Sequence, residues 1–295
     1  MREGRFATIG TFDGVHLGHR LLLDTLTAMA DDARLRPAAF ILEKHPLALV
    51  APQRMPPQLS SFHEKARMVS ELGVEVIPLS FNESTRRLTS AGFMDKIADE
   101  FGVRALLIGH DNKIGCDRDS GFADYLRHGR DTGMRVEEAP ALPGVSSSAV
   151  RKALLGGDVR RGGAMLGHPY SLAGTVVHGE HLGTRLGFPT ANMRPESPEL
   201  LVPAGGVYAT MARIEGYETL MPSVTNIGVR PTVASGVPAV SIETYIPGFS
   251  ADIYGRSISL DFIDRIRDEQ RFPSLDALVQ RMRLDTQLAL DLLRH

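Results

Sequence analysis

The sequence predicts two successive domains, an α/β domain with a parallel sheet and then an antiparallel β domain that ends in a helix. In the first half, short apolar runs alternate with segments of helical periodicity, which is typical of βαβ units. Beyond about residue 170, apolar and polar residues alternate with period two and no long helix intervenes until the C-terminal segment. A length of 295 residues also exceeds that of a usual single domain.

The elements of the first half follow from its apolar runs. The expected strands are residues 6–9, 38–42, 74–79 and 104–109. The expected helices pass through Leu21, Leu22, Leu26 and Met29, and then cover residues 63–72 and 91–101. Strands separated by helices in this way predict a parallel sheet covered by helices.

The second half shows strand periodicity instead. Val240, Ile242, Thr244 and Ile246 are expected on one face of a strand, with Ser241, Glu243 and Tyr245 on the other. Ile258, Leu260 and Phe262 repeat the alternation, so a barrel or a sandwich is expected. Ser274 is a good N-cap for a final helix. We place the domain boundary near Gly167-His168-Pro169, which gives domains 1–168 and 169–295.

Composition excludes several classes of function. The formal net charge of -2 provides no basic field to attract nucleic acid, and no stretch reaches the roughly 18 apolar residues of a membrane span. The single cysteine, Cys116, rules out a disulfide within the chain and favours a reducing compartment. We therefore expect a soluble, cytoplasmic protein that binds neither nucleic acid nor membrane.

The most informative segment of the first half joins the first strand to the first helix. It contains Thr11, Phe12, Gly14, His16, Gly18 and His19. In an open parallel sheet, ligands bind where strands end, and a helix N-terminus suits phosphates. Glycines allow a close approach, and imidazoles can donate hydrogen bonds to phosphate oxygens. Two surface histidines, or an unrelated metal site, are the alternatives. A P-loop mechanism is excluded, because no G-x-x-x-x-G-K-[ST] sequence occurs.

This segment resembles the HxGH signature of the nucleotidyltransferases. The longer string FDGVHLGH resembles the FAD synthetase module of bacterial bifunctional riboflavin kinase/FMN adenylyltransferases. The resemblance implies that these residues bind ATP, with His16 and His19 catalytic. It extends to the segment with Ser147, Ser148 and Arg151, which matches a second ATP-phosphate motif. Taken alone, that segment is an ordinary helix start.

Flavin binding in the same module is implied at three matching positions, His45, Pro46 and Asp111. Three nearby positions depart from the family pattern, where aromatic residues are usual: Leu42, Asn112 and Ile114. These departures therefore affect the predicted flavin pocket of this module, and they do not affect the predicted phosphate-binding residues.

The second half carries a more specific set of motifs. Its motifs are GFPTAN at residues 187–192 and NIGVRPT at 226–232, followed by Glu243, Arg267 and Glu269. In this order they resemble the riboflavin kinase domain throughout residues 170–295. The resemblance implies an antiparallel β-barrel with a C-terminal helix. It also implies flavin binding by Arg267 and Glu269 and ATP binding by Gly179, Gly183, Gly187, Thr190 and Asn192.

The residue chemistry agrees with this resemblance. Thr190 and Asn192 offer neutral oxygens, and Mg²⁺ prefers oxygen ligands while ATP supplies the negative charge. Glu243 offers a carboxylate that can take the proton of a substrate hydroxyl. A plain turn at Pro189-Thr190 and a solvated strand glutamate are the alternatives for isolated motifs.

The resulting hypothesis is a bifunctional enzyme that uses ATP and Mg²⁺ to phosphorylate riboflavin to FMN and then to adenylylate FMN to FAD. One alternative is a riboflavin kinase whose first domain no longer adenylylates FMN. Another is a protein that stores flavin or nucleotide without turnover. The sequence indicates no obligatory protein partner and leaves homo-oligomerisation open.

Overall fold

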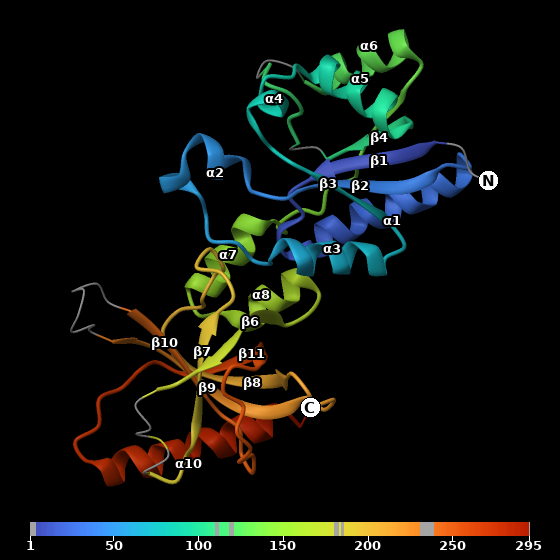
Figure 1. The fold of residues 1–295 in the computed structure, drawn as a ribbon. Helices are drawn as coiled ribbons and strands as arrows, with labels where there is room; N and C mark the ends of the chain where they lie inside the picture. Colours follow the sequence, from blue (N-terminus) through green and yellow to red (C-terminus); the bar gives the residue numbers. More distant parts are fainter. Residues whose placement is uncertain are drawn as a thin grey trace. The chain divides into compact units, whose positions relative to one another are not determined.

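The computed structural model describes residues 4–109, 112–117, 121–179, 183, 186–230 and 239–294. The chain forms two compact units (Figure 1). The first consists of Met1–Pro56 and Ser60–Ser146, and the second of Pro57–Leu59 and Ser147–His295. Each unit is described by itself.

The first unit is built on a five-stranded sheet in the order β3-β2-β1-β4-β5, in which every pair is parallel. The strands are β1 Arg5–Gly10, β2 Arg36–Leu42, β3 Glu75–Leu79, β4 Val103–Ile108 and β5 Arg135–Glu138. Strand β1 lies between β2 and β4, so the strand order reverses beside it. In open α/β sheets, ligands bind outside the carboxyl ends of the strands at such a point.

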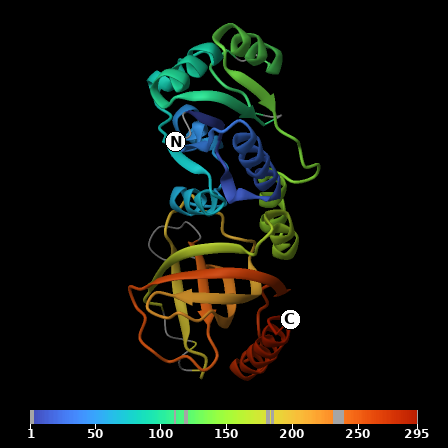
Figure 2. The same cartoon turned by 90° about the vertical axis from the view of Figure 1, so that its right-hand side faces the viewer.

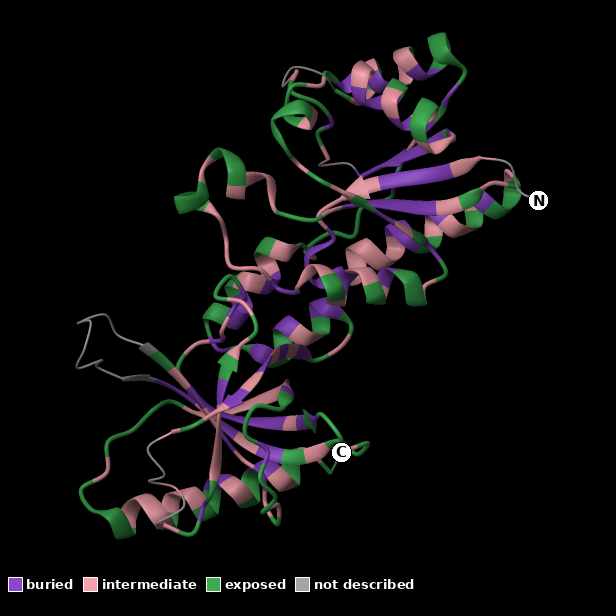
Figure 3. Cartoon of the chain, viewed as in Figure 1, coloured by how far each residue is buried: buried purple, intermediate pink, exposed green. Residues whose placement is uncertain are grey.

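Both faces of this sheet are covered, and Figure 3 shows buried residues along its strands. The helices are α1 Leu17–Asp32, α2 Pro46–Val50, α3 Phe62–Glu71, α4 Glu83–Arg86, α5 Ser90–Phe101 and α6 Phe122–Thr132, with short 3₁₀ turns η1 Asp13–Val15 and η2 Pro52–Arg54. Neighbouring residues of β1 point to opposite faces. Phe6 packs in a cluster with Leu23 of α1, and Ala7 in a cluster with Met94 of α5.

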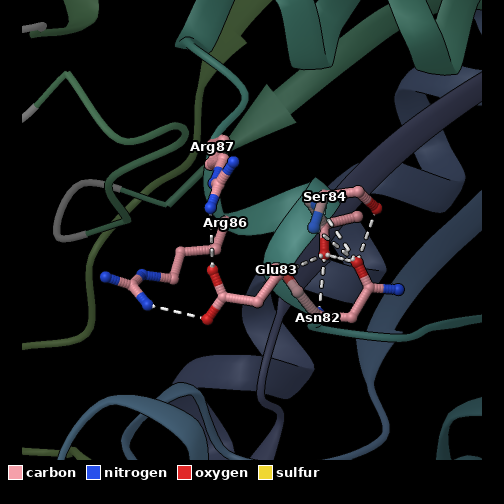
Figure 4. Close-up of polar contacts among 6 residues, drawn as sticks. Asn82, Glu83, Ser84, Arg86 and Arg87 are labelled. Carbon is pink, nitrogen blue, oxygen red and sulfur yellow. Dashed lines mark hydrogen bonds and ion pairs between the residues drawn. The ribbon is translucent and has the colours of Figure 1, made fainter.

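The strands and helices expected in this half are confirmed, whereas α2, α4, α6 and β5 had not been predicted. Helix α4 is short and has no buried residue, so it lacks an apolar pattern. Local polar contacts define it (Figure 4). The side chain of Asn82 accepts hydrogen bonds from the backbone N–H groups of Ser84 and Thr85, and Glu83 pairs with Arg86 at 2.9 Å.

The second unit is a closed antiparallel barrel with the strand order β10-β7-β6-β11-β8-β9. Figure 2 shows the barrel strands crossing beside the C-terminal helix. The elements are α7 Ser147–Leu155, α8 Val159–Leu166, β6 Tyr170–Val177, β7 Thr190–Pro195, β8 Gly206–Ile214, β9 Met221–Arg230, β10 Ala239–Tyr245, β11 Ser257–Arg267 and α10 Leu275–Leu292. The predicted fold class, with a parallel-sheet domain and a barrel, is confirmed.

The barrel interior combines apolar and hydroxyl side chains. Tyr170, Leu172 and Val176 alternate inward along β6. The hydroxyl groups of Thr210 and Thr225 lie 2.8 Å apart, and those of Thr225 and Thr244 lie 3.0 Å apart, so these buried polar atoms are satisfied.

Two details of the second half bear on its predicted elements. Ile242, Thr244 and Ile246, expected on one strand face, are buried, whereas Val240 of the same set is 54% exposed and is the second residue of β10. The predicted cap of the last helix is confirmed, since the side chain of Ser274 accepts a hydrogen bond from the N–H of Ala277. Within the described part of the chain, no helix has the length and apolar character needed to cross a membrane.

The predicted boundary near residue 168 stays a prediction. Helices α7 and α8 belong to the second compact unit. Helix α8 packs on β11 and β6 of the barrel, while α7 packs on α8.

Candidate functional site

The segment between β1 and α1 is a strained loop at the end of the central strand. Phe12, Gly14 and Val15 have φ angles of 49°, 76° and 39°. Glycine adopts such values readily, whereas an aromatic or β-branched residue does so at a cost of roughly 1–3 kcal/mol. Strain of this kind persists only where the surrounding structure fixes the conformation, and it occurs often at functional sites.

Two buried polar side chains fix this loop. The N–H of Gly14 donates to Ser60 Oγ at 2.9 Å, and the N–H of Ser60 donates to Asp13 Oδ1 at 3.2 Å. Asp13 and Ser60 are 5% and 3% exposed, so these two hydrogen bonds are shielded from water. Together these bonds tie η1 to the segment that precedes α3.

The two histidines of the loop lie together. The rings of His16 and His19 are stacked, with centroids 3.7 Å apart and planes 13° from parallel. His16 is the N-cap of α1, and its Nδ1 accepts the N–H of His19 at 3.2 Å. An accepting Nδ1 places the proton of a neutral imidazole on Nε2, which is then a hydrogen-bond donor. Gly18 makes the arrangement possible, because a Cβ there would lie 3.1 Å from the His16 ring.

The environment keeps His19 neutral. Burial of the ring lowers the pKa of His19 well below its usual value, and the charges of His16 and Lys65 lower it further. Some of the side chain stays accessible, but the Nδ1 atom is buried. His19 therefore presents a neutral ring at pH 7, beside the accepting Nδ1 of His16.

The residues predicted for flavin binding in the first unit are placed in part. His45 caps α2 through its Nδ1, which accepts the N–H of Leu47 at 3.1 Å, and Pro46 begins that helix. Asp111 lies outside the described residues. The departures from the family pattern have structural uses here. Asn112 donates from Nδ2 to the carbonyl of Ile9 at 2.7 Å, and Ile114 is buried in the core beside Tyr125.

The second predicted ATP-phosphate motif begins α7, in the second unit. Ser147 and Ser148 occupy its first turn, and Arg151 donates from Nε to the carbonyl of Pro57 at 2.7 Å. The chain that leads to this motif passes the histidine loop within the first unit. A Cβ on Gly18 would lie 3.7 Å from the carbonyl oxygen of Val145.

In the barrel, strand register assembles the second group of predicted residues. Strand β7 pairs with β10 so that Asn192 faces Glu243 and Thr190 faces Tyr245. The hydroxyl of Thr190 lies 3.4 Å from Glu243 Oε2. Glu243, which is 53 residues from Thr190 in sequence, is therefore a neighbour of both Thr190 and Asn192. The predicted glycines pack close by, since a Cβ on Gly179 would overlap the Asn192 side chain and one on Gly183 would lie 3.2 Å from Thr190 Oγ1.

A cavity of about 330 Å³ lies between these strands and α10. Its lining includes Gly183, Thr190, Glu243, Arg267 and Glu269, five of the predicted site residues. Apolar and aromatic side chains complete the walls, among them Val207, Phe188, Tyr245, Phe272, Leu278 and Met282. An apolar cavity with a few convergent polar groups is the usual form of a small-molecule site.

The sequence prediction missed Asp285, which joins this cavity to the final helix. Its Oδ2 atom lies 2.7 Å from Arg267 Nη2, and its Oδ1 atom 2.8 Å from Arg281 Nε. The Asp285 side chain is 3% exposed. Charge spacing gave a partial signal, because Arg281 and Asp285 stand four apart on one helix. The link to Arg267 depends on tertiary structure.

A second cavity of about 370 Å³ adjoins Thr190 on the other side. Phe249, Ile253 and Tyr254 line it, and the Tyr254 ring stacks on His178 with centroids 3.9 Å apart. Thr190 lines both cavities. The sequence prediction noted the segment with Phe249 only as a departure from the family and did not assign it a cavity.

The donor chemistry fits a hard cation. The described residues include no group of three or more histidine, cysteine, aspartate or glutamate side chains that could hold a metal ion. Thr190, Asn192 and Glu243 instead offer hydroxyl, amide and carboxylate oxygens from neighbouring strand positions. Oxygen ligands are those that Mg²⁺ prefers, and it usually takes one or two carboxylates together with substrate phosphates.

Comparison with known proteins supports the resemblance of both halves of the chain to their families. Residues 1–152 match the family model described as FAD synthetase, and residues 166–293 match the one described as riboflavin kinase. The chain belongs to the bifunctional riboflavin kinase/FMN adenylyltransferase family. A relative with that name from Pseudomonas fluorescens is 39% identical over 97% of this chain and 92% of its own length. Another, from Escherichia coli strain K12, is 36% identical over 96% of this chain and 91% of its own.

A more distant member of the family, from Bacillus subtilis, is 32% identical over 96% of this chain and 90% of its own length. Among solved structures, one described as a macrolide-efflux protein from Streptococcus pneumoniae has a TM-score of 0.87 and 25% sequence identity. That alignment covers 98% of this chain and 97% of the other. The two-domain fold is therefore shared well beyond the range of high sequence identity.

Proposed function

We propose that the barrel phosphorylates riboflavin to FMN and that the parallel-sheet unit adenylylates FMN to FAD, both with ATP and Mg²⁺. The observation that carries the kinase assignment is the position of Glu243. Its carboxylate lies beside Thr190 in the wall of an apolar cavity of about 330 Å³. Family membership supports both activities over either alternative.

The kinase reaction needs a donor, an acceptor and a base at one point. The two cavities that share Thr190 suit this need, because the γ-phosphoryl group of ATP must pass from one substrate to the other. We assign riboflavin to the cavity with Arg267 and Glu269, and the nucleotide to Gly179, Gly183, Gly187 and Asn192, of which Gly183 also lines that cavity. Glu243 then accepts the proton of the 5′-hydroxyl group.

The metal is part of this proposal. Thr190 and Asn192 would hold Mg²⁺ together with the phosphate oxygens of ATP, and the ion would neutralise negative charge on the transferring group. The protein residues position the hydroxyl and the phosphate, and the apolar walls of the cavity exclude water.

The adenylyl transfer requires two phosphates in line and donors for their developing charge. We propose that His16 and His19 donate to the phosphates of ATP, with Thr11, Phe12, Gly14 and Gly18 shaping the loop around them. Ser147, Ser148 and Arg151 would contribute a second set of contacts. His45, Pro46 and Asp111 are proposed to contact the flavin.

One assay tests the whole assignment. The protein is incubated with riboflavin, ATP and Mg²⁺, and the flavins are separated by chromatography. We expect FMN followed by FAD, and no turnover when a chelator removes the metal. FMN alone would favour the kinase with an altered first domain, for which Leu42, Asn112 and Ile114 are the motivating residues. Flavin retained without ATP consumption would favour a storage protein.

The remaining assignments accompany this proposal. We assign residues 1–168 to the adenylyltransferase and 169–295 to the kinase. A cytoplasmic location is proposed because the single cysteine in the sequence excludes an internal disulfide framework.

A further inference from the structure

A buried lysine lies on α3, the helix that packs on η1 of the histidine loop, and none of the sequence motifs contains it. Lys65 on α3 is 6% exposed, and its Nζ donates to the carbonyl of Leu42 at 3.0 Å. Lysine is almost never buried to this extent unless it is paired, because its charge is costly to remove from water. Among the described residues, its Nζ contacts one backbone carbonyl and the Phe62 ring, whose centroid is 5.7 Å away, so the position of this lysine calls for a further reason.

The charges around Lys65 connect it with both parts of the loop. Burial lowers the pKa of Lys65, and the carboxylate of Asp13 opposes that shift. Lys65 in turn helps to lower the pKa of His19, after burial and the charge of His16. The groups that act on His19 are thus His16 at the start of its own helix and Lys65 from α3, while Asp13 of η1 acts on Lys65.

Asp13 therefore has two partners with separate uses. Its Oδ1 accepts the N–H of Ser60, whose hydroxyl in turn accepts the N–H of Gly14 in the strained turn. Its charge offsets that of Lys65. The loop clamp and the buried cation therefore share one carboxylate.

We propose that Lys65 is a positioning residue of the adenylyltransferase site, acting through Asp13 and His19. Its fixed charge supplies a positive potential for the triphosphate of ATP, so the imidazoles need not be protonated to attract it. Neutral rings keep the Nδ1 of His16 as an acceptor, which preserves the hydrogen bond that holds His19 in place. The proposal rests on the proposed adenylyltransferase function of the same site.

The test uses the full-length protein with supplied FMN, ATP and Mg²⁺. Lys65→Met removes the charge and keeps most of the stem, whereas Lys65→Gln removes the charge and keeps a donor for Leu42. We expect either change to lower kcat/KM for FAD formation about 10- to 100-fold, mainly through KM for ATP, as is usual when a group that orients a functional residue is lost. Kinase activity of the same polypeptide should be unchanged.

The pH profile distinguishes electrostatic action from a purely structural effect. Removing Lys65 removes one cause that lowers the pKa of His19, so that pKa should rise. The acid limb of FAD formation should then move to higher pH in both variants. Ser60→Ala loosens the clamp and leaves the charges in place, so it should lower the rate without moving the acid limb. Lys96→Met, at an exposed pair with Glu100 on α5, is the control and should match the wild type.

Two results would overturn the proposal while leaving the function intact. One is wild-type kcat/KM in a folded Lys65→Gln variant. The other is a loss of activity in which the acid limb stays where it is in the wild type. If the wild-type protein makes no FAD, the proposed function itself fails, and the lysine assignment falls with it for a different reason.

Discussion

The two candidate sites are assembled in opposite ways. In the parallel-sheet unit, the histidines stand within one turn of each other, and a single short loop brings their rings to 3.7 Å. In the barrel, Thr190 and Glu243 are 53 residues apart and meet only through the pairing of β7 with β10. The first site depends on a local backbone conformation and its clamp, and the second on strand register and a docked helix.

This difference has a consequence for how each site fails. A one-residue slip in a strand turns every side chain to the opposite face, so the barrel site needs the correct register throughout. The histidine loop needs unusual φ angles instead. These are stabilised by two buried hydrogen bonds, from Gly14 to Ser60 and from Ser60 to Asp13. The following changes separate the two sites, beginning with the largest expected effect.

Glu243→Gln should damage the barrel site alone. The amide keeps the shape of the side chain but cannot accept the proton of the riboflavin hydroxyl. We expect FMN formation to fall about 10²–10⁴-fold, the usual contribution of a general base. FAD formation from supplied FMN should continue at the wild-type rate. A kinase rate equal to that of the wild type would remove Glu243 from the role of base.

His19→Ala should produce the converse result. Loss of one preorganised donor to a developing negative charge typically reduces kcat about 10²–10³-fold. FAD formation from supplied FMN is the measurement, and FMN formation from riboflavin should be spared. His63→Ala, an exposed histidine on α3, is a matched control. Equal losses of both activities in His19→Ala would argue against separate sites.

Asp285→Asn tests the dependence of the barrel site on its helix. The change leaves Arg267, whose side chain is 11% exposed, without its charged partner. Breaking a buried pair in this way costs about 3–5 kcal/mol, so the free energy of unfolding should fall markedly. The KM for riboflavin should rise, because Arg267 lines the cavity. Calorimetry and kinase kinetics are the measurements.

The matched control is Asp291→Asn on the same helix. Asp291 forms an exposed pair with Arg294 at 3.4 Å, and such pairs contribute only about 0–1 kcal/mol. If the two variants unfolded at the same temperature, the buried link would not be what holds α10 in place.

Ser274→Ala should have the smallest effect. It removes the side chain that caps α10 through the N–H of Ala277, a loss of about 1 kcal/mol. Ser274→Gly should lower the free energy of unfolding by only a few tenths of a kcal/mol, since glycine is also accepted at an N-cap. Thermal unfolding compares them. A shift as large as that of Asp285→Asn would mean that the local cap, rather than the tertiary link, governs this helix.

Much of the fold could be predicted from the sequence. The apolar runs that became β1, β2, β3 and β4 are strong signals because a parallel strand is buried on both faces. Helix α4 was missed because it buries nothing, and β5 because only Val136 of its four residues is buried. An exposed element has no apolar period to reveal it.

The residues of the candidate sites also differ in whether a local sequence pattern reveals them. The histidine pair could be predicted, since residues three apart at a helix start face the same way. Lys65 and Asp285 could not, because each is an ordinary charged residue of an amphipathic helix until the partner from another element is known.

The sequence by itself determined the two fold classes, the cap of α10, and the set of motif residues at the ends of strands. It did so because hydrophobic periodicity and turn chemistry are local properties of the chain. Only the tertiary structure decided that Thr190 lines two cavities, that Asp285 holds Arg267, and that Lys65 is buried with its Nζ bonded to the carbonyl of Leu42. Those facts depend on distances between residues far apart in sequence, and packing alone sets them.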